Sequence, residues 1–313
     1  MIQLVDRVVA ITGAGRGLGR AYALEAGRLG AKVVVNDAAV AGDGVPRAQQ
    51  VVDEIEAGGG TALLSCHDIM TPEGAVGLID RTVAAFGRID GLVNNAGFLR
   101  PALVADISEP QMQELTAVHL YAAFRTVRAA WPHMRAQGFG RIVLTGSGSS
   151  FGHEGNSVYS AMKAAMIGMT RSLALEGAGW NCRVNCVLPH AQSMLSIENP
   201  LPGVSATETG ELMALLQSRR TPRSVAPLAA YLLSDECAVN GEAISALGGL
   251  FARVVYGTSR GWVSERPDET TADDLAANLA QIMDTSEWVT PLSVGDEMRL
   301  AFDRFRADAL LGS

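Results

Sequence analysis

Few features of the sequence suit a secreted or membrane-bound protein. It has only four cysteines among 313 residues, no C-x-x-C pair, and a first segment, MIQLVDRVVAITG, without the basic stretch and apolar run of a signal peptide. No apolar run approaches the roughly 18 residues that would cross a bilayer. We therefore expect reduced cysteines, a cytoplasmic location, no membrane span and no metal site.

Positive charge is also scarce. The chain has 25 lysines and arginines against 33 aspartates and glutamates, a formal net charge of −8. Nucleic acids and anionic membranes would be repelled at long range by such a protein. The expected partner is a small-molecule substrate, and neither nucleic acid nor membrane is expected to bind.

What the sequence does have is a regular alternation of strand-like and helix-like segments. Because the strand-like runs are apolar almost throughout, they predict strands buried on both faces of a sheet. The alternation predicts right-handed crossovers. We expect an α/β fold with a doubly wound, Rossmann-type parallel sheet of about seven strands, formed by residues 1–251 as a single domain. The seven runs are VVAIT (8–12), KVVVND (32–37), TALLSC (61–66), GLVNN (91–95), GRIVLTG (140–146), RVNCVL (183–188) and EAISALG (242–248).

Three segments depart from this alternation. Residues 252–313 are predicted to be a C-terminal extension that completes the pocket or forms a dimer contact, because its scattered aromatics need an apolar surface. Residues 190–222 mix apolar residues with prolines after a strand end, which predicts a lid over an apolar substrate. Residues 108–137 are long for one helix, and Pro132 is expected to break or bend it.

A glycine-rich stretch, TGAGRGLGR at 12–20, follows the first predicted strand and opens the first helix. Gly13, Gly17 and Gly19 would leave bare backbone where a pyrophosphate approaches a helix N-terminus. This context of strand, glycines and helix is what gives such a motif its weight. The stretch predicts a dinucleotide site.

Three polar residues bear on which dinucleotide binds. Asp37 ends the second predicted strand, where its carboxylate would accept a hydrogen bond from a ribose 2′-hydroxyl, which favours NAD. Arg16 favours NADP instead, since a guanidinium attracts the 2′-phosphate, but Asp37 would repel that phosphate. Asp68, just after the third strand, either receives the adenine amino group or forms a turn. We expect NAD.

Tyr159 and Lys163, in SVYSAMKAAM, are four residues apart and so share one helix face. A free tyrosine has a pKa of about 10, and a nearby ammonium favours its phenolate. Tyr159 would then accept the hydroxyl proton of an alcohol while hydride leaves for a nicotinamide. The Y-x-x-x-K pattern alone is common in helices, and it gains meaning here from the glycine-rich stretch.

Taken in order, these motifs resemble the short-chain dehydrogenase/reductase family over residues 5 to about 250: the glycine-rich stretch, NNAG at 94–97, a serine after the fifth strand, and Tyr159-x-x-x-Lys163. Segments such as AVHLYAAF and VAPLAAYLLSDE are similar to the (3R)-hydroxyacyl-CoA dehydrogenase domain of type 2 peroxisomal multifunctional enzymes, a group that includes 17β-hydroxysteroid dehydrogenase type 4. The resemblance implies a dehydrogenase, and we expect it to use NAD and to form a homodimer or homotetramer.

Catalytic roles for Ser147, Tyr159, Lys163 and His119 follow from the resemblance. The family's serine stands thirteen residues before the tyrosine, where this chain has a glycine. Alignment from the strand end selects Ser147, with Ser149 as the alternative. His119 replaces an asparagine that in most relatives helps to hold a water near the lysine. A proton-relay role and a structural role for His119 both stay open.

The resemblance also implies how the cofactor is held. Asn95, Ala96 and Gly97 would lie beside the nicotinamide-side ribose, and the backbone of Pro189 would hold the carboxamide. His190 follows Pro189 in place of the family's usual glycine. The expected cofactor-binding residues are Gly13, Arg16, Gly17, Leu18, Gly19, Asp37, Asp68, Ile69, Asn95, Ala96, Gly97, Tyr159, Lys163 and Pro189.

The substrate expected from the resemblance is a (3R)-3-hydroxyacyl-CoA or its 3-oxo partner. Arg219, Arg220 and Arg223 could bind phosphates of a CoA tail or form a solvated face. Sterols, other secondary alcohols and 3-oxoacyl-carrier-protein substrates would use the same catalytic residues. A dinucleotide-sensing regulator on the same fold is the non-enzymatic alternative, against which the intact tyrosine-lysine pair argues.

Overall fold

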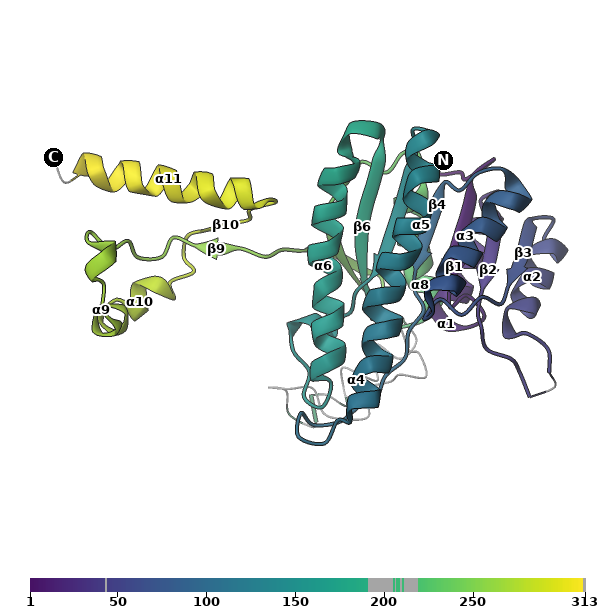
Figure 1. Cartoon of the computed structure of the whole chain (residues 1–313), viewed down its shortest axis with the longest axis horizontal. Helices are drawn as coiled ribbons and strands as arrows, with labels where there is room; N and C mark the ends of the chain where they lie inside the picture. Colours follow the sequence, from purple (N-terminus) through teal and green to yellow (C-terminus); the bar gives the residue numbers. More distant parts are fainter. Residues whose placement is uncertain (43, 191–204, 206, 209, 211–218, 312–313) are drawn as a thin grey trace. The chain divides into compact units, whose positions relative to one another are not determined.

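The computed structural model describes residues 1–42, 44–190, 205, 207–208, 210 and 219–311 (Figure 1). Most of the predicted lid, 190–222, therefore lies outside the described residues. The chain divides into two compact units, Met1–Arg253 and Val254–Ser313. Among the described residues, no helix combines the length and apolarity needed to span a bilayer.

The first unit is built on an eight-stranded sheet with the order β3-β2-β1-β4-β5-β6-β7-β8. Neighbouring strands from β3 to β7 are parallel, so the expected doubly wound α/β fold is confirmed. The strands are β1 (Val8–Thr12), β2 (Lys32–Asn36), β3 (Thr61–Ser65), β4 (Gly91–Asn94), β5 (Gly140–Thr145), β6 (Cys182–Pro189), β7 (Ala243–Leu247) and β8 (Leu250–Val254).

The eighth strand is the addition to the seven expected. β7 and β8 are joined by Gly248 and Gly249, whose φ angles are 56° and 95°. Two consecutive residues with positive φ form the tight turns of β-hairpins, and glycine adopts them without strain.

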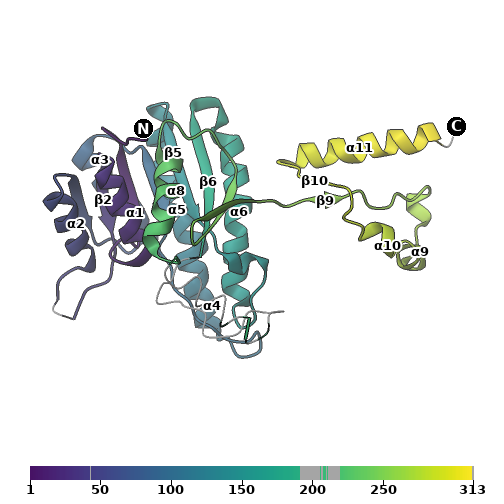
Figure 2. The same cartoon turned by 180° about the vertical axis from the view of Figure 1, so that it is seen from behind.

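Two layers of helices cover the sheet. Helices α1, α2 and α8 pack on one face, and α3, α4, α5 and α6 pack on the other (Figures 1 and 2). The helices are α1 (Gly17–Arg28), α2 (Arg47–Ala57), α3 (Pro72–Phe86), α4 (Glu109–Thr116), α5 (Ala122–Ala136), α6 (Ser157–Gly177) and α8 (Pro222–Leu233), with short 3₁₀ turns at Gly148–Phe151 and Ala178–Trp180.

This layering explains why the strands are apolar throughout. Every residue of β1, β4 and β5 is buried, because helices cover both sides. The strand order reverses between β1 and β4, so the connections after these two strands diverge to opposite faces of the sheet. The crevice at the carboxyl ends of the strands at such a point is where open α/β sheets bind ligands.

The segment 108–137 is interrupted, but not where the sequence predicted. A π-helical turn, Ala117–Tyr121, separates α4 from α5, and α5 continues through Pro132 to Ala136. The prediction of a break at Pro132 is therefore wrong. The interruption surrounds His119, and π-turns of this kind occur often at functional sites.

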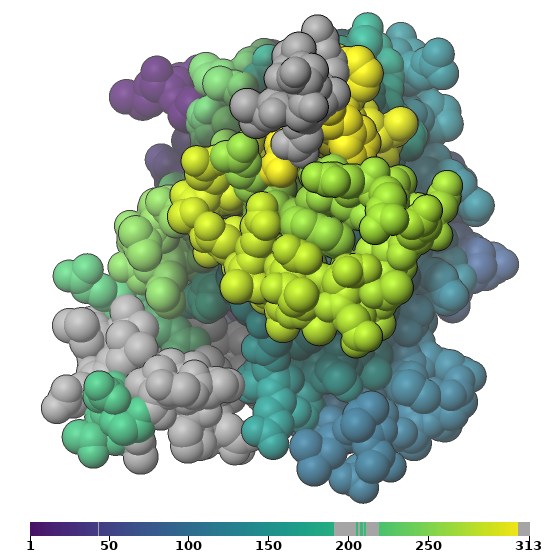
Figure 3. Space-filling view, turned by 90° about the vertical axis from the view of Figure 1, so that its left-hand side faces the viewer, coloured from purple at the N-terminus to yellow at the C-terminus, as the bar shows by residue number. Residues whose placement is uncertain are grey.

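The second unit is small and exposes many apolar side chains. It contains a two-stranded antiparallel sheet of β9 (Thr258–Ser259) and β10 (Trp288–Val289), a 3₁₀ turn at Pro267–Glu269, and helices α9 (Ala272–Ala277), α10 (Leu279–Ile282) and α11 (Val294–Leu311). Its atoms are coloured yellow-green to yellow in Figure 3. The exposed apolar side chains include Leu275, Leu279, Met283, Trp288, Phe302 and Phe305.

Candidate active site

The backbone of the glycine-rich loop between β1 and α1 packs closely against the turn after β4 and against itself. A Cβ built on Gly13, whose φ is 61°, would lie 2.7 Å from the Cα of Ala96, and one on Gly19 would lie 2.2 Å from the carbonyl oxygen of Gly13. Gly17, with a φ of 56°, instead faces open space, with no atom within 4 Å of such a Cβ. Bare backbone is thus exposed at the N-terminus of α1, as phosphate binding requires.

Thr12 ties this loop to the end of β4. Its hydroxyl donates to the Val93 carbonyl at 3.3 Å and accepts from the backbone N–H groups of Asn95 at 2.9 Å and Ala96 at 3.1 Å. The Asn95 side-chain amide donates in turn to the carbonyls of Thr12 at 3.0 Å and Gly13 at 3.2 Å. The NNAG turn and the glycine loop are therefore held together by their own hydrogen bonds.

Asp37 lies against the same loop. One carboxylate oxygen accepts from the backbone N–H of Gly15 at 3.2 Å, and the other accepts from that of Ala39 at 2.9 Å. Each oxygen keeps a lone pair for a further donor such as a ribose hydroxyl. We call Thr12, Gly13, Asp37, Asn95 and Ala96 together the cradle. The predicted Arg16 is exposed at the N-cap of α1, and Leu18 is half-buried in its first turn.

Asp68 is used in a turn. Its side chain accepts from the backbone N–H of Met70 at 3.0 Å, and its carbonyl accepts from the Thr71 hydroxyl at 2.9 Å. Of the two roles expected from the sequence, the turn is the one with visible contacts, and the adenine contact stays a prediction. The neighbouring Ile69 is buried and lines the cavity described below.

Tyr159 and Lys163 lie on one face of α6. The Lys163 ammonium donates to the Thr145 carbonyl at 2.7 Å and lies 5.6 Å from the centre of the Tyr159 ring. Burial lowers the pKa of Lys163 to about 8. Burial also raises the pKa of Tyr159, and a hydrogen bond with Ser147 only partly opposes this. Desolvation of the phenolate therefore sets the direction of the Tyr159 pKa shift.

The two candidate serines have different partners. Ser147 follows β5, hydrogen-bonds Tyr159, and accepts from the backbone N–H of Ser149 at 3.1 Å. The Ser149 hydroxyl lies 3.5 Å from Nδ1 of His153. The structure thus places Ser147 beside Tyr159 and turns Ser149 toward another residue.

His119 is buried in the π-helical turn and packs edge-on against Tyr159, with ring centres 5.1 Å apart. Its Nε2 lies 2.8 Å from the Phe98 carbonyl, which only accepts, so Nε2 carries the proton and Nδ1 is an acceptor. Burial, with a smaller effect of Lys163, lowers the pKa of His119 to about 3. A Cβ on Gly97 would lie 2.2 Å from its Cε1, so Gly97 leaves room for this ring.

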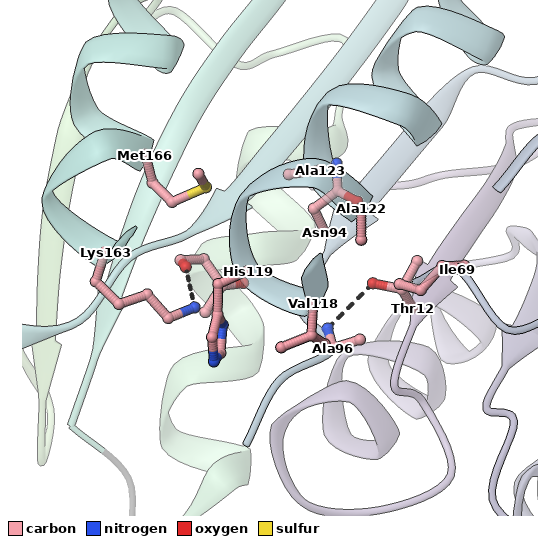
Figure 4. A pocket seen from close by; sticks show the side chains of 11 residues that line it. Thr12, Ile69, Asn94, Ala96, Val118, His119, Ala122, Ala123, Lys163 and Met166 are labelled. Atoms are coloured by element: carbon pink, nitrogen blue, oxygen red, sulfur yellow. Dashed lines mark hydrogen bonds between the residues drawn. The ribbon is translucent and has the colours of Figure 1, made fainter. Parts of the chain in front are cut away.

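A cavity of about 10 Å³, near the lower limit for one water, is lined by residues that include Asn94, His119 and Lys163 (Figure 4). We call it the catalytic cavity. Three buried polar atoms on its lining residues have no protein partner in the described part of the chain: Nδ2 of Asn94, Nδ1 of His119 and Oγ1 of Thr145. Unpaired buried groups are uncommon, and three of them around one cavity make it the candidate catalytic centre.

The end of β6 carries Pro189 and His190. The His190 backbone N–H donates to the Ala246 carbonyl at 2.9 Å, and its carbonyl accepts from the Arg220 side chain at 3.3 Å. Arg223 lies instead near Glu25 of α1 and helps to lower the pKa of that carboxyl, after Arg28. Arg220 and Arg223 therefore interact with different parts of the fold.

Three site residues were missed by the sequence reasoning: Thr12, Asn94 and Thr145. Each ends an apolar strand, and a buried polar residue at a strand's carboxyl end is the signal that could have found Thr12 and Asn94. Asn94 accepts from the Thr126 hydroxyl at 2.7 Å. Thr145 binds Lys163 through its backbone carbonyl, which no side-chain pattern reveals.

Comparison with known proteins agrees with this geometry. The family model described as short chain dehydrogenase matches residues 7–193. A short-chain type dehydrogenase/reductase of Mycobacterium tuberculosis is 37% identical over 286 residues, covering 90% of this chain and 95% of that protein.

Longer multifunctional proteins match as well. The peroxisomal hydratase-dehydrogenase-epimerase of Saccharomyces cerevisiae is 38% identical over 271 residues, covering 85% of this chain. The solved structure of full-length peroxisomal multifunctional enzyme type 2 from Drosophila melanogaster superposes with a TM-score of 0.79 at 29% identity, covering 96% of this chain. The chain spans only 28% of the yeast protein and 49% of the Drosophila one. The resemblance to type 2 multifunctional enzymes is confirmed.

Proposed function

The chain belongs to the short-chain dehydrogenase family and is an oxidoreductase that acts on CH–OH groups, and on that premise we propose that it is an NAD-dependent (3R)-3-hydroxyacyl-CoA dehydrogenase. The observation that carries the proposal is the contact of Ser147, Tyr159, Lys163 and His119 at the carboxyl edge of the sheet.

Proton transfer is the task of Tyr159. In alcohol oxidation its oxygen takes the substrate's hydroxyl proton, and in reduction it returns that proton. Ser147 hydrogen-bonds Tyr159 and would hold the reacting oxygen beside it. Because burial raises the pKa of Tyr159, the residue is a proton donor in its resting form and needs the Lys163 charge nearby to act as a base.

The cradle fits a nicotinamide dinucleotide. Gly13 and Gly19 keep the loop tight, and Gly17 leaves open space where a pyrophosphate can approach the helix N-terminus. Asp37 would bind a ribose 2′-hydroxyl with its remaining lone pairs and would repel a 2′-phosphate, which favours NAD. Such a dinucleotide, when bound, accepts or supplies the hydride.

The acyl-CoA substrate is supported by the resemblance of the sequence to the (3R)-hydroxyacyl-CoA dehydrogenase domain of type 2 multifunctional enzymes, and by the match to a peroxisomal multifunctional enzyme type 2. The prediction that three arginines bind the CoA phosphates together now applies to fewer of them, because Arg220 and Arg223 interact with different elements. The Arg220 side chain reaches the backbone just after β6, so Arg220 is the arginine near the proposed site. Sterols and other secondary alcohols remain the competing substrates.

We also propose that residues 252–313 complete the pocket or contact a second subunit in a homodimer or homotetramer. The exposed Trp288, Phe302 and Phe305 support this, since large apolar side chains gain by burial at an interface. Deletion of this segment should lower activity and subunit association together. An unchanged oligomer with full activity would refute the proposal.

A cytoplasmic location is proposed as well, supported by four free cysteines. Two relatives are peroxisomal by name. Fractionation of the source cells distinguishes cytosol from a peroxisomal compartment.

The decisive experiment measures kcat/KM for both enantiomers of 3-hydroxyacyl-CoA substrates and for sterols, each with NAD and with NADP. The proposal expects the (3R) thioester with NAD to be the best combination. Preference for the (3S) enantiomer, or for a free sterol over every acyl-CoA, would overturn it.

A further inference from the structure

His190 is a residue at the carboxyl edge of the sheet to which the reaction assigns no task. It follows Pro189 at the end of β6, and its ring lies against the loop that carries Ser147. A Cβ built on Gly148 would lie 2.1 Å from Cε1 and 2.6 Å from Nε2 of His190. Gly148 is not among the glycines with positive φ. Its missing side chain is therefore explained by the close approach of the imidazole, not by the backbone conformation.

The position of His190 is fixed by its backbone. Its N–H donates to the Ala246 carbonyl on β7, and its carbonyl accepts from the side chain of Arg220, two residues before α8. The adjoining strand ends are joined by a bond from the Gly146 N–H to the Val187 carbonyl at 2.8 Å. Ser147 and His190 thus follow the ends of the neighbouring parallel strands β5 and β6, and the His190 ring lies against Gly148, the residue after Ser147.

The imidazole is suited to binding a neutral polar group. It is half-buried, and its ring has no hydrogen-bond partner among the residues that the structure describes. Burial, followed by the nearby Arg220, lowers the pKa of His190, which favours the neutral form of the ring. A neutral imidazole offers one N–H donor and one acceptor nitrogen. Cε1 and Nε2 are the ring atoms nearest to the Cβ position built on Gly148, and Nδ1 is farther from it, at 3.2 Å.

We propose that His190 is a specificity-determining residue that hydrogen-bonds a second oxygen of the substrate, the thioester carbonyl of a 3-oxygenated acyl thioester. The reacting oxygen and the thioester oxygen are on carbons separated by one methylene, and they require two polar groups side by side. Ser147 and His190 would supply such a pair, because the imidazole lies against Gly148, the residue that follows Ser147. A sterol or simple secondary alcohol has no oxygen at the second position, so the imidazole would favour the thioester. This inference rests on the proposed acyl-CoA activity.

The test compares two substrates that differ only in that oxygen: a (3R)-hydroxyacyl-CoA thioester and the CoA thioether in which a methylene replaces the carbonyl. Wild type and His190→Leu are measured with both. In wild type, loss of the carbonyl should lower kcat/KM about tenfold, as one neutral hydrogen bond predicts. In His190→Leu the loss of the carbonyl should lower kcat/KM less than twofold. His190→Gln, which keeps a hydrogen-bond donor, should restore part of the difference in kcat/KM between thioester and thioether.

The remaining outcomes are distinct. If wild type oxidises neither the thioester nor the thioether, the proposed function fails and this inference fails with it. If it oxidises both, but the carbonyl contributes equally in wild type and in His190→Leu, the inference alone is wrong. A rise in KM for NAD with both substrates would show that the imidazole serves the cofactor, and would also overturn it. Should the leucine variant not fold, as judged by its thermal melt, His190→Ala takes its place.

Discussion

The cradle and the catalytic cavity lie side by side at one edge of the sheet, yet their polar groups are satisfied in opposite ways. In the cradle, the side chains of Thr12 and Asn95 make five hydrogen bonds to backbone groups of β1, the glycine loop, β4 and the turn after β4. In the catalytic cavity, Asn94, His119 and Thr145 each present a buried atom without a protein partner in the described chain. The pKa values of Lys163 and His119 are strongly lowered there as well.

This difference matches the different tasks of the two regions, which are ligand binding in the cradle and catalysis in the cavity. A cradle that satisfies its own hydrogen bonds keeps one shape before a ligand arrives, which reduces the cost of binding. A catalytic centre needs groups that can exchange partners and charge, and such groups are left unpaired at a cost in stability. The two regions should therefore respond differently to mutation, one in stability and the other in turnover.

The largest expected effect is in the catalytic region. Tyr159→Phe removes only the transferable proton, and general acid–base catalysis contributes on the order of 10²- to 10⁴-fold. We expect turnover to fall by that factor while NAD affinity, measured by titration calorimetry, stays within about twofold. Retention of more than a tenth of wild-type turnover would mean that another group transfers the proton.

The next test uses two threonines at corresponding places. Thr12 and Thr145 are buried at the ends of β1 and β5, but only the Thr12 hydroxyl has partners. Thr12→Val strands two backbone N–H groups and should lower the free energy of unfolding by about 1 to 3 kcal/mol. Thr145→Val should be nearly neutral in the same urea titration. An equal loss at Thr145 would show that its hydroxyl is satisfied by a cavity water and would erase the contrast.

A pH titration of stability tests the lowered pKa of His119. Its pKa is about 3 in the folded protein and about 6.5 when unfolded, so the unfolded chain binds more protons between these values. Stability should therefore fall as pH drops below 6.5, by up to about 2 kcal/mol at pH 5 from this group. His119→Asn should lose less stability than wild type over that interval. If the free energy of unfolding of wild type and of His119→Asn changed equally with pH, His119 would be charged or solvated in the folded protein.

The sequence predicted most of the fold because strand burial and glycine spacing are local signals. The seven expected strands, the glycine loop and the pairing of Tyr159 with Lys163 on one helix face could all be read from residue spacing. The π-helical turn at His119 could not, since it depends on packing against Phe98 and Tyr159. Nor could the unpaired Thr145 hydroxyl, because the absence of a partner is set by residues distant in sequence.

The smallest expected effect is in the cradle, at Asp37, whose charge is proposed to select NAD over NADP. Wild type should prefer NAD over NADP at least tenfold in kcat/KM, which corresponds to about 1.4 kcal/mol. Asp37→Ser keeps a polar side chain but removes the charge that repels a 2′-phosphate. The preference should narrow toward equality, mainly through a lower KM for NADP. Asp37→Asn, which matches the size of the carboxylate, is the control: it should narrow the preference as far, since charge and not shape is the cause. Equal use of both cofactors by wild type would instead show that the Arg16 guanidinium outweighs Asp37, and the cradle would then select NADP as readily as NAD.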